Sequence, residues 1–123
     1  MTTSLYALTF DCADTMRTAR FWSDVLGRPL DDESTEEFAS IGVFGEGTGE
    51  TAWMFLPVPE GKTLKNRCHP DLITPDLEAE IARLVGLGAS RHSEHSENDV
   101  RWVTLTDPEG NEFDVIAGPS AAA

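Results

Sequence analysis

Apolar residues recur at helical spacing in two stretches of the chain. In the first stretch, Asp14 stands where a side-chain oxygen can cap a helix that runs to about Leu26, and Gly27 and Pro29 stop it. The apolar residues fall three and four positions apart, which gives the helix one face to lay on a sheet. They are Phe21, Trp22, Val25 and Leu26.

A second helix is predicted from the same kind of pattern. Pro75 and Asp76 begin it, and Gly88 closes it at a position where a left-handed residue is commonly needed. Its apolar stripe consists of Leu77, Ile81, Leu84 and Val85.

Short apolar runs predict strands around both helices. Residues 5–10 predict a short buried strand before the first helix, and Gly45, Gly47 and Gly49 predict a hairpin loop after it. After the second helix comes a polar, acidic stretch, residues 90–99, and then a hairpin whose turn is Asp107-Pro108-Glu109-Gly110-Asn111. The other predicted strands are residues 39–44, 52–58, 67–74, 100–106 and 112–116.

The two halves of the chain repeat one order of elements. Asp14 and Asp76 lie 62 positions apart, and each follows a strand and opens a helix. Those helices end at Leu26-Gly27 and Leu87-Gly88, which lie 61 positions apart. A slip of one residue over a whole helix indicates two copies of one supersecondary unit.

Charge limits the classes of partner. The chain has 22 acidic residues against nine basic ones, a formal net charge of −13. This charge would repel a phosphate backbone and an anionic membrane surface, so we expect neither a nucleic-acid nor a membrane partner. The same field could concentrate a cationic ligand, although solubility is the preferred explanation.

The cellular compartment is predicted from targeting and membrane-spanning patterns that the sequence does not show. Residues 1–8 carry no basic region followed by a long apolar stretch, and no segment approaches the roughly 20 apolar residues of a membrane span. Cys12 and Cys68 form no recognisable disulfide framework, so we expect reduced thiols whose role is packing. A cytoplasmic location follows.

An ordered set of motifs between Leu5 and Ala117 resembles the glyoxalase and bleomycin-resistance branch of the vicinal oxygen chelate superfamily. Each motif is weak alone, but their order is specific. They are Asp14, Phe21-Trp22, Leu26-Gly27, residues 65–71 (KNRCHPD), Leu87-Gly88-Ala89 and residues 107–113 (DPEGNEF).

The resemblance implies an α+β fold of two βαβββ modules, about residues 4–60 and 65–118, within a single domain of residues 1–123. A curved mixed sheet would enclose a cavity for a small-molecule ligand, with the helices outside. A homodimer is also implied. The superfamily includes metal-dependent lyases, isomerases and dioxygenases and metal-free antibiotic-sequestering proteins, so the fold alone does not name the reaction.

The resemblance also implies where metal ligands would stand. One position lies seven residues before each capping aspartate, at Ala7 and His69. Another lies on the last strand of a module, at Asp114, whereas residues 52–58 offer no carboxylate, histidine or cysteine. Two protein ligands rarely hold a divalent ion, so a third donor would have to come from Glu112, Asp71 or a partner chain.

Other uses of these polar residues stay open. Strand alternation places His69 on one face with Arg67 and Asp71. His69 could be a ligand, a proton-transfer group with Asp114, or a histidine that is only hydrogen-bonded to a neighbouring carboxylate. Arg67 could hold a ligand carboxylate or carbonyl, but pairing with Asp71 is preferred.

Three tryptophans are candidates for an aromatic cavity. Trp22 lies on the helix stripe and is expected in the core, whereas Trp53 and Trp102 lie on strands and could contact a ligand. His92 and His95 have a spacing that metals sometimes use, but we expect them to be solvated.

Two functions follow from these patterns. The preferred one is a small-molecule-binding protein without a tightly bound metal, similar in action to antibiotic-sequestering relatives. The alternative is a metal-dependent lyase or isomerase that acts on a small carbonyl or diol compound, with Zn, Ni, Mn or Fe at His69 and Asp114.

Overall fold

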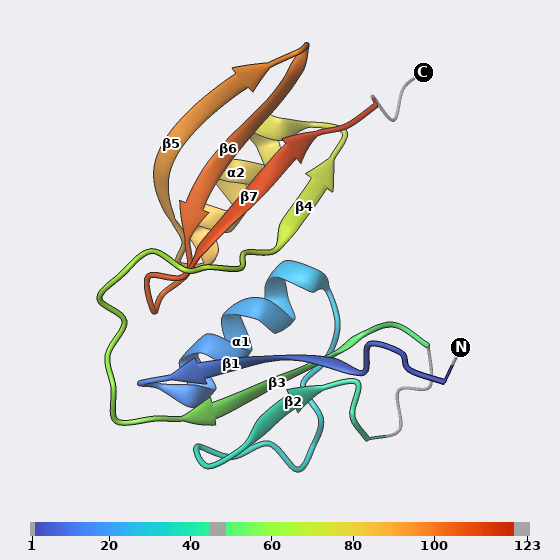
Figure 1. The fold of residues 1–123 in the computed structure, drawn as a ribbon, viewed down its shortest axis with the longest axis vertical. Helices are drawn as coiled ribbons and strands as arrows, with labels where there is room; N and C mark the ends of the chain where they lie inside the picture. Colours follow the sequence, from blue (N-terminus) through green and yellow to red (C-terminus); the bar gives the residue numbers. More distant parts are fainter. Residues whose placement is uncertain (1, 45–48, 120–123) are drawn as a thin grey trace. The chain divides into compact units, whose positions relative to one another are not determined.

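The computed structural model describes residues 2–44 and 49–119 and divides into two compact units, Met1–Gly61 and Lys62–Ala123 (Figure 1). Each unit contains one sheet with one helix packed against it. Neither helix of the described residues has the length and apolar character of a membrane-spanning segment. That the two units together form a single domain stays a prediction.

The first unit contains a three-stranded sheet. Its elements, in chain order, are β1 (Ala7–Cys12), α1 (Thr15–Leu26), β2 (Ala39–Ile41) and β3 (Ala52–Pro57). The strand order is β1-β3-β2, with β1 parallel and β2 antiparallel to β3. The antiparallel pair is what the predicted hairpin requires; Gly45 and Gly47 of its loop lie outside the described residues.

The second unit contains a four-stranded sheet. Its elements are β4 (Asp71–Thr74), α2 (Leu77–Leu87), β5 (Ser90–Glu97), β6 (Val100–Thr106) and β7 (Glu112–Ala117). The strand order is β4-β7-β6-β5, with β4 parallel to β7 and the other pairs antiparallel. The matching orders β1-β3-β2 and β4-β7-β6 confirm the predicted repeat and its α+β fold class.

The units differ at one strand. The described part of the first unit has no counterpart of β5, because residues 28–38 run there as an irregular segment. Hydrogen bonds to the Asp31 side chain fix this segment in place. The buried Asp31 carboxylate accepts hydrogen bonds from the Ser40 hydroxyl (2.7 Å) and from the backbone amides of Val43 (2.9 Å) and Phe44 (3.3 Å).

The cores form where the helix stripes meet the sheets. In the first unit the fully buried Trp22 ring lies 5.1 Å from that of Trp53 and 5.5 Å from that of Phe10, between centroids. In the second unit Ile81 and Leu84 of α2 are buried. The sheet residues buried with them are Val103, Leu105, Phe113 and Val115.

One member of the predicted second stripe is not in the core. Val85 is 46% exposed. It follows the fully buried Leu84 directly, and successive residues of a helix point about 100° apart, so the two cannot face the same sheet equally. The prediction for Val85 is therefore wrong.

Three strand predictions need correction at their ends. β1 begins at Ala7 and is an edge strand, and Leu5 before it is exposed rather than buried. β2 ends at Ile41 because Gly42 has a φ of +75° and turns the chain toward Asp31. β4 begins only at Asp71 because Pro70 has no N–H to donate to a ladder.

The polar stretch after α2 forms an edge strand, β5. A two-residue turn, Asn98 and Asp99, joins it to β6, and both residues have positive φ (51° and 63°). Tight hairpins favour such turns because their twist matches that of the strands, and Asn and Asp tolerate the conformation. The local chemistry of the turn therefore favours a strand where the composition alone suggested only a polar segment.

Both helices begin at an aspartate cap. The Asp14 carboxylate accepts a hydrogen bond from the Arg17 amide, and that of Asp76 accepts one from the Ala79 amide, each at 3.2 Å. We expect Asp76→Ala to lower the free energy of unfolding by about 1 kcal/mol, because an amide of the first turn loses its acceptor. Chemical denaturation measures this loss. Asp76→Ser, which keeps a capping oxygen, should recover most of it; equal losses in both variants would contradict the capping role.

Candidate functional site

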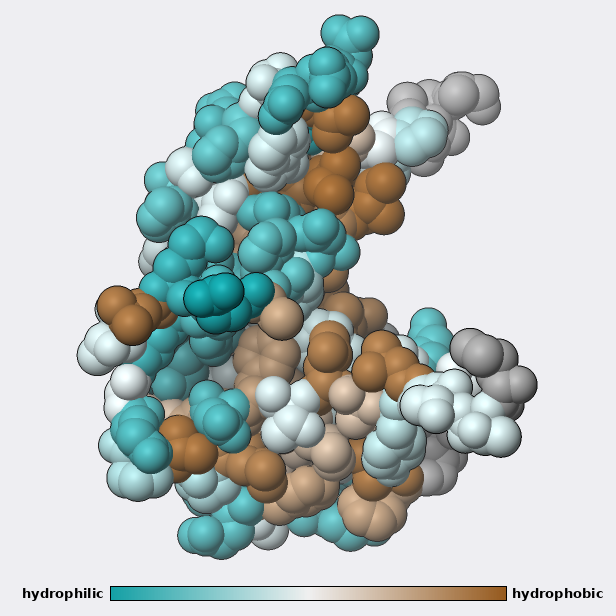
Figure 2. All heavy atoms as spheres, in the orientation of Figure 1, coloured by the Kyte–Doolittle hydropathy of each residue, from teal (hydrophilic) through white to brown (hydrophobic). Residues whose placement is uncertain are grey.

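The strands of the second sheet alternate between a core face and an open face. Val103 and Leu105 of β6 and Phe113 and Val115 of β7 are buried on the core face, which α2 covers. The residues between them are half-buried and form the open face, opposite α2. Hydrophobic atoms are visible at the surface of this unit in Figure 2, among more numerous hydrophilic ones.

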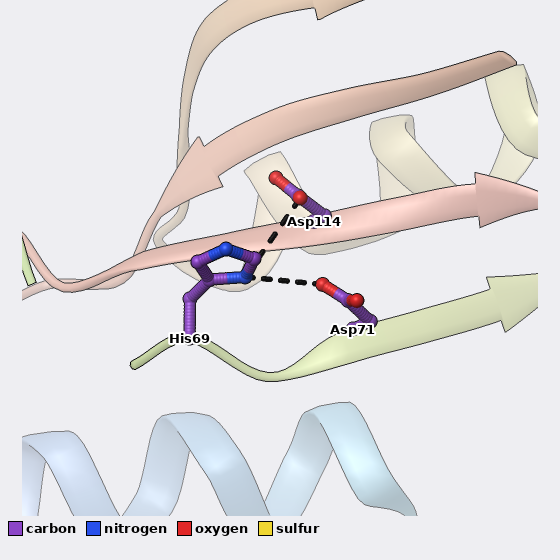
Figure 3. A group of neighbouring side chains, drawn as sticks. All are labelled: His69, Asp71 and Asp114. Atoms are coloured by element: carbon purple, nitrogen blue, oxygen red, sulfur yellow. Dashed lines mark hydrogen bonds and ion pairs between the residues drawn. The ribbon is translucent and has the colours of Figure 1, made fainter. Parts of the chain in front are cut away.

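Three polar side chains meet on the open face. The His69 Nδ1 atom lies 3.1 Å from the Asp71 Oδ1 atom and 3.8 Å from the Asp114 Oδ2 atom (Figure 3). One potential ligand atom from each side chain lies within 4.8 Å of the other two. The side chains of His69 and Asp71 are 35% and 52% exposed, and that of Asp114 is 17% exposed. The cluster is thus open to solvent on one side.

The parallel pairing of two strands places the carboxylates. Asp71, the first residue of β4, is the register partner of Asp114 on β7, so both point to the same face. His69 precedes the strand. The segment that contains it is fixed to β7 by the hydrogen bond from the Asp114 amide to the Pro70 carbonyl (3.0 Å). The predicted strand alternation from Arg67 to Asp71 is therefore wrong, although His69 and Asp71 do meet.

Thr104 orients the Asp114 carboxylate. It is the register partner of Asp114 on the other neighbouring strand, β6, and its hydroxyl donates a hydrogen bond of 2.6 Å to the Oδ1 atom. The Oδ2 atom is left facing His69. Sequence reasoning missed Thr104, because its partnership with Asp114 depends on the register of β6 against β7.

Glu112, one of the predicted third donors, is engaged elsewhere. Its carboxylate accepts hydrogen bonds from the Asn66 backbone amide (2.9 Å) and from the Lys62 ammonium group (3.2 Å). Burial alone would raise the pKa of Glu112, but these two donors and the backbone amide of Glu112 itself outweigh it and leave the pKa below its usual value. Glu112 thus anchors the segment that leads to His69 and does not join the cluster.

Arg67 does not pair with Asp71. Within residues 2–44 and 49–119 the exposed Arg67 side chain makes no hydrogen bond or ion pair, and Asp71 is engaged by His69 instead. The preferred pairing is therefore wrong. The reason is that Arg67 precedes Pro70 and β4 and does not take part in the strand alternation.

Of the two strand tryptophans, Trp53 faces the helix of its unit and Trp102 faces away from the helix of its unit. Trp53 is only 7% exposed and packs on Trp22, so its placement does not support the predicted contact with a ligand. Trp102 is half-buried on the open face of the second sheet. The imidazole of His95, predicted to be solvated, is exposed on β5 and stacks on Trp102, with ring centroids 5.3 Å apart and an interplanar angle of 17°.

The donor set of the cluster fits a divalent cation. One imidazole nitrogen and two carboxylate oxygens match the ligands of Zn²⁺, Mn²⁺ and Fe²⁺, and three protein ligands are typical of catalytic sites. The same atoms can instead share a proton, since His69 can donate from Nδ1 to either carboxylate. In the first unit the matching positions are Ala7, Thr9 and Met54, which supply no such set.

The comparisons with known proteins agree with this architecture. A family model described as a glyoxalase-like domain matches residues 7–116, nearly the whole chain. The chain belongs to the glyoxalase-like domain family. No significant match to a curated protein sequence was found.

Solved structures share the fold of this glyoxalase-like protein. A glyoxalase/bleomycin resistance protein/dioxygenase family enzyme from Burkholderia phytofirmans is 14% identical, with a TM-score of 0.73 over 93% of this chain and 98% of that chain. A mutant of the fosfomycin resistance protein FosX from Listeria monocytogenes, in complex with Mn(II) and 1S,2S-dihydroxypropylphosphonic acid, is 15% identical, with a TM-score of 0.74 over 96% of this chain and 92% of that chain. FosX from Mesorhizobium loti is 16% identical, with a TM-score of 0.71 over 96% and 94%.

Proposed function

We propose that this glyoxalase-like protein binds a small molecule on the open face of its second sheet and holds a divalent ion at His69, Asp71 and Asp114. With that ion it would act as a lyase or isomerase on a small carbonyl or diol compound. The observation that carries the proposal is the third donor. Asp71 stands in register with Asp114 and within 3.1 Å of His69, so the ligand count reaches that of catalytic sites.

Each residue has a definite part in this proposal. Asp71 and Asp114 would offer carboxylate oxygens to the ion, and His69 would offer an imidazole nitrogen. A bound ion would supply Lewis-acid stabilisation of negative charge that develops on neighbouring ligand oxygens. Thr104 holds one Asp114 oxygen so that the other stays turned toward His69. The exposure of His69 and Asp71 leaves the cluster accessible to a ligand.

A metal-free binding protein is the second candidate. The observation that favours it is the apolar or neutral character of Ala7, Thr9 and Met54, the first-unit positions that match His69, Asp71 and Asp114. In this case the His69 imidazole would share its proton with the two carboxylates, and the acidic cluster would suit a cationic group of the ligand.

Metal titration of the wild-type protein and of Thr104→Val tests the two candidates, because the substitution removes one hydroxyl while it keeps the shape of the side chain. If an ion binds, the Asp114 carboxylate loses its orienting donor, and we expect the affinity for Zn²⁺ to fall about tenfold. Isothermal titration calorimetry on untagged protein measures this change. Thr106→Val is the matched control, since Thr106 lies two residues further along β6 and its side chain makes no hydrogen bond within residues 2–44 and 49–119. No measurable binding of Zn²⁺, Mn²⁺, Ni²⁺ or Fe²⁺ to the wild-type protein would favour the metal-free candidate.

The family resemblance supports two further parts of the proposal, which are one domain made of both units and a homodimer. We also propose a cytoplasmic location, because Cys12 and Cys68 form no recognisable disulfide framework. Sedimentation equilibrium tests the dimer: we expect a mass of twice the 13.4 kDa chain, and a monomer at every concentration would contradict it.

A further inference from the structure

The open face of the second sheet carries two cross-strand rows of side chains. One row is polar: Ser93, Thr104, Asp114 and Asp71 are successive register partners across β5, β6, β7 and β4. The neighbouring row lies two residues along each strand. It consists of His95, Trp102, Ile116 and Ile73, again successive partners.

The second row has aromatic and apolar members beside the acidic cluster. Trp102 and Ile116 are half-buried, and Ile73 is 70% exposed, an unusual position for a large apolar side chain. Because two residues of a strand span about 7 Å, this row begins one such step from the Asp71 and Asp114 carboxylates. A ring attached directly to an oxygen-bearing carbon can cover that span.

Stacking holds the indole of Trp102 in place. The His95 imidazole lies nearly parallel to it, with ring centroids 5.3 Å apart, and the Ser93 hydroxyl is 2.8 Å from the His95 Nε2 atom. A ring whose orientation is fixed before binding loses less conformational entropy when a flat ligand contacts it. By contrast, Trp22 and Trp53 are buried in the core of the first unit.

We propose that the row of Trp102, Ile116 and Ile73 is a subsite for a planar apolar ring. The ligand of this protein is accordingly an aryl compound, with its ring next to the oxygens that the proposed function places at the acidic cluster. This inference rests on the proposed function for the placement of the oxygens at His69, Asp71 and Asp114. The position of the ring follows from the register of the sheet.

A matched pair of probes tests the ring subsite. The probes are 1-phenylethane-1,2-diol and propane-1,2-diol, which share the vicinal diol and differ in a phenyl against a methyl group. Binding is measured by calorimetry with and without Zn²⁺, and the indole N–H resonances are followed by NMR. We expect the phenyl compound to bind about tenfold more tightly, and the Trp102 resonance to shift while those of Trp22 and Trp53 stay in place.

Substitution of Trp102 gives the decisive comparison. We expect Trp102→Leu to weaken the phenyl compound about threefold to tenfold and to leave propane-1,2-diol unchanged, whereas Trp102→Phe keeps most of the preference. Val85→Ala, which removes exposed apolar surface from α2, is the control and should change neither affinity. Circular dichroism verifies that each variant is folded.

The outcomes separate this inference from the metal proposal. If Zn²⁺ does not bind but the phenyl preference depends on Trp102, the ring subsite stands and the metal role fails. If Zn²⁺ binds but both diols bind equally, or neither binds, the ring subsite is overturned and the metal role stands. A phenyl preference that survives in Trp102→Leu also overturns it, and would indicate that the ring binds elsewhere.

Discussion

Replacing Asp114 with asparagine is expected to raise the dissociation constant for Zn²⁺ at least about 100-fold. Changes to groups that only support a metal ligand cost about 10- to 100-fold in affinity, so loss of a charged ligand should cost no less. The amide of asparagine keeps the size of the side chain but removes its charge, and with it half of the negative charge offered by the two carboxylates of the cluster. Calorimetric titration of both proteins with ZnCl₂ measures the ratio.

The control for this variant is Asp99→Asn. Asp99 lies in the exposed β5–β6 turn, in the same unit, and asparagine tolerates its positive φ of 63°. The substitution removes the same charge from a protein with a net charge of −13, without touching the cluster. We expect its Zn²⁺ affinity to stay within about threefold of the wild type. Equal losses in Asp99→Asn and Asp114→Asn would mean that Zn²⁺ responds only to the overall charge.

The second large effect is expected at the β6–β7 turn. Asp107 is only 4% exposed, and its carboxylate accepts hydrogen bonds from the amides of Glu109 and Asn111, both at 2.9 Å, and from the Asn111 side chain at 3.0 Å. Asp107→Ala removes all three acceptor contacts in a turn that Gly110 closes with a φ of +86°. We expect the free energy of unfolding to fall by about 3 kcal/mol, as measured by urea denaturation.

Two further variants define the cause of that loss. Asp107→Asn keeps one carbonyl oxygen for the two amides, so we expect a smaller loss of about 1 kcal/mol. Asp32→Ala removes an exposed aspartate and should change stability by less than about 0.5 kcal/mol. If Asp107→Ala were as stable as Asp32→Ala, the turn would not depend on the buried carboxylate.

The features that sequence predicted best depend on local chemistry. Asp14 and Asp76 cap their helices, and Gly27 and Gly88 end them with positive φ, as the spacing of these residues indicates. The β6–β7 hairpin was predicted for the same reason, since Asp107 and Gly110 specify the turn within five residues. Each of these signals acts over one turn of chain, and no long-range pairing is needed to interpret it.

The features that sequence predicted poorly depend on register between distant strands. Thr104 contacts the cluster, and Asp71 belongs to it, only because both are paired with Asp114, from strands on its two sides. The sequence indicated Asp71 and Glu112 equally as the third metal ligand. The contacts of Lys62 and Asn66 with Glu112 decide between them, and these span 50 and 46 positions of the chain.

The burial of single strand residues was equally beyond local signals. Trp53 and Trp102 both lie on strands with alternating faces, and either face could have been the buried one. The contact of Trp53 with Trp22 and that of Trp102 with His95 assign the first to a core and the second to an open face.

An anomalous difference map from a crystal of untagged protein soaked in ZnCl₂, recorded at the zinc absorption edge, tests the central claim most directly. We predict one strong peak per chain, in contact with the His69 imidazole and with the carboxylates on β4 and β7. A map without density at this position, or with its peaks only at other surface carboxylates, would contradict the metal centre.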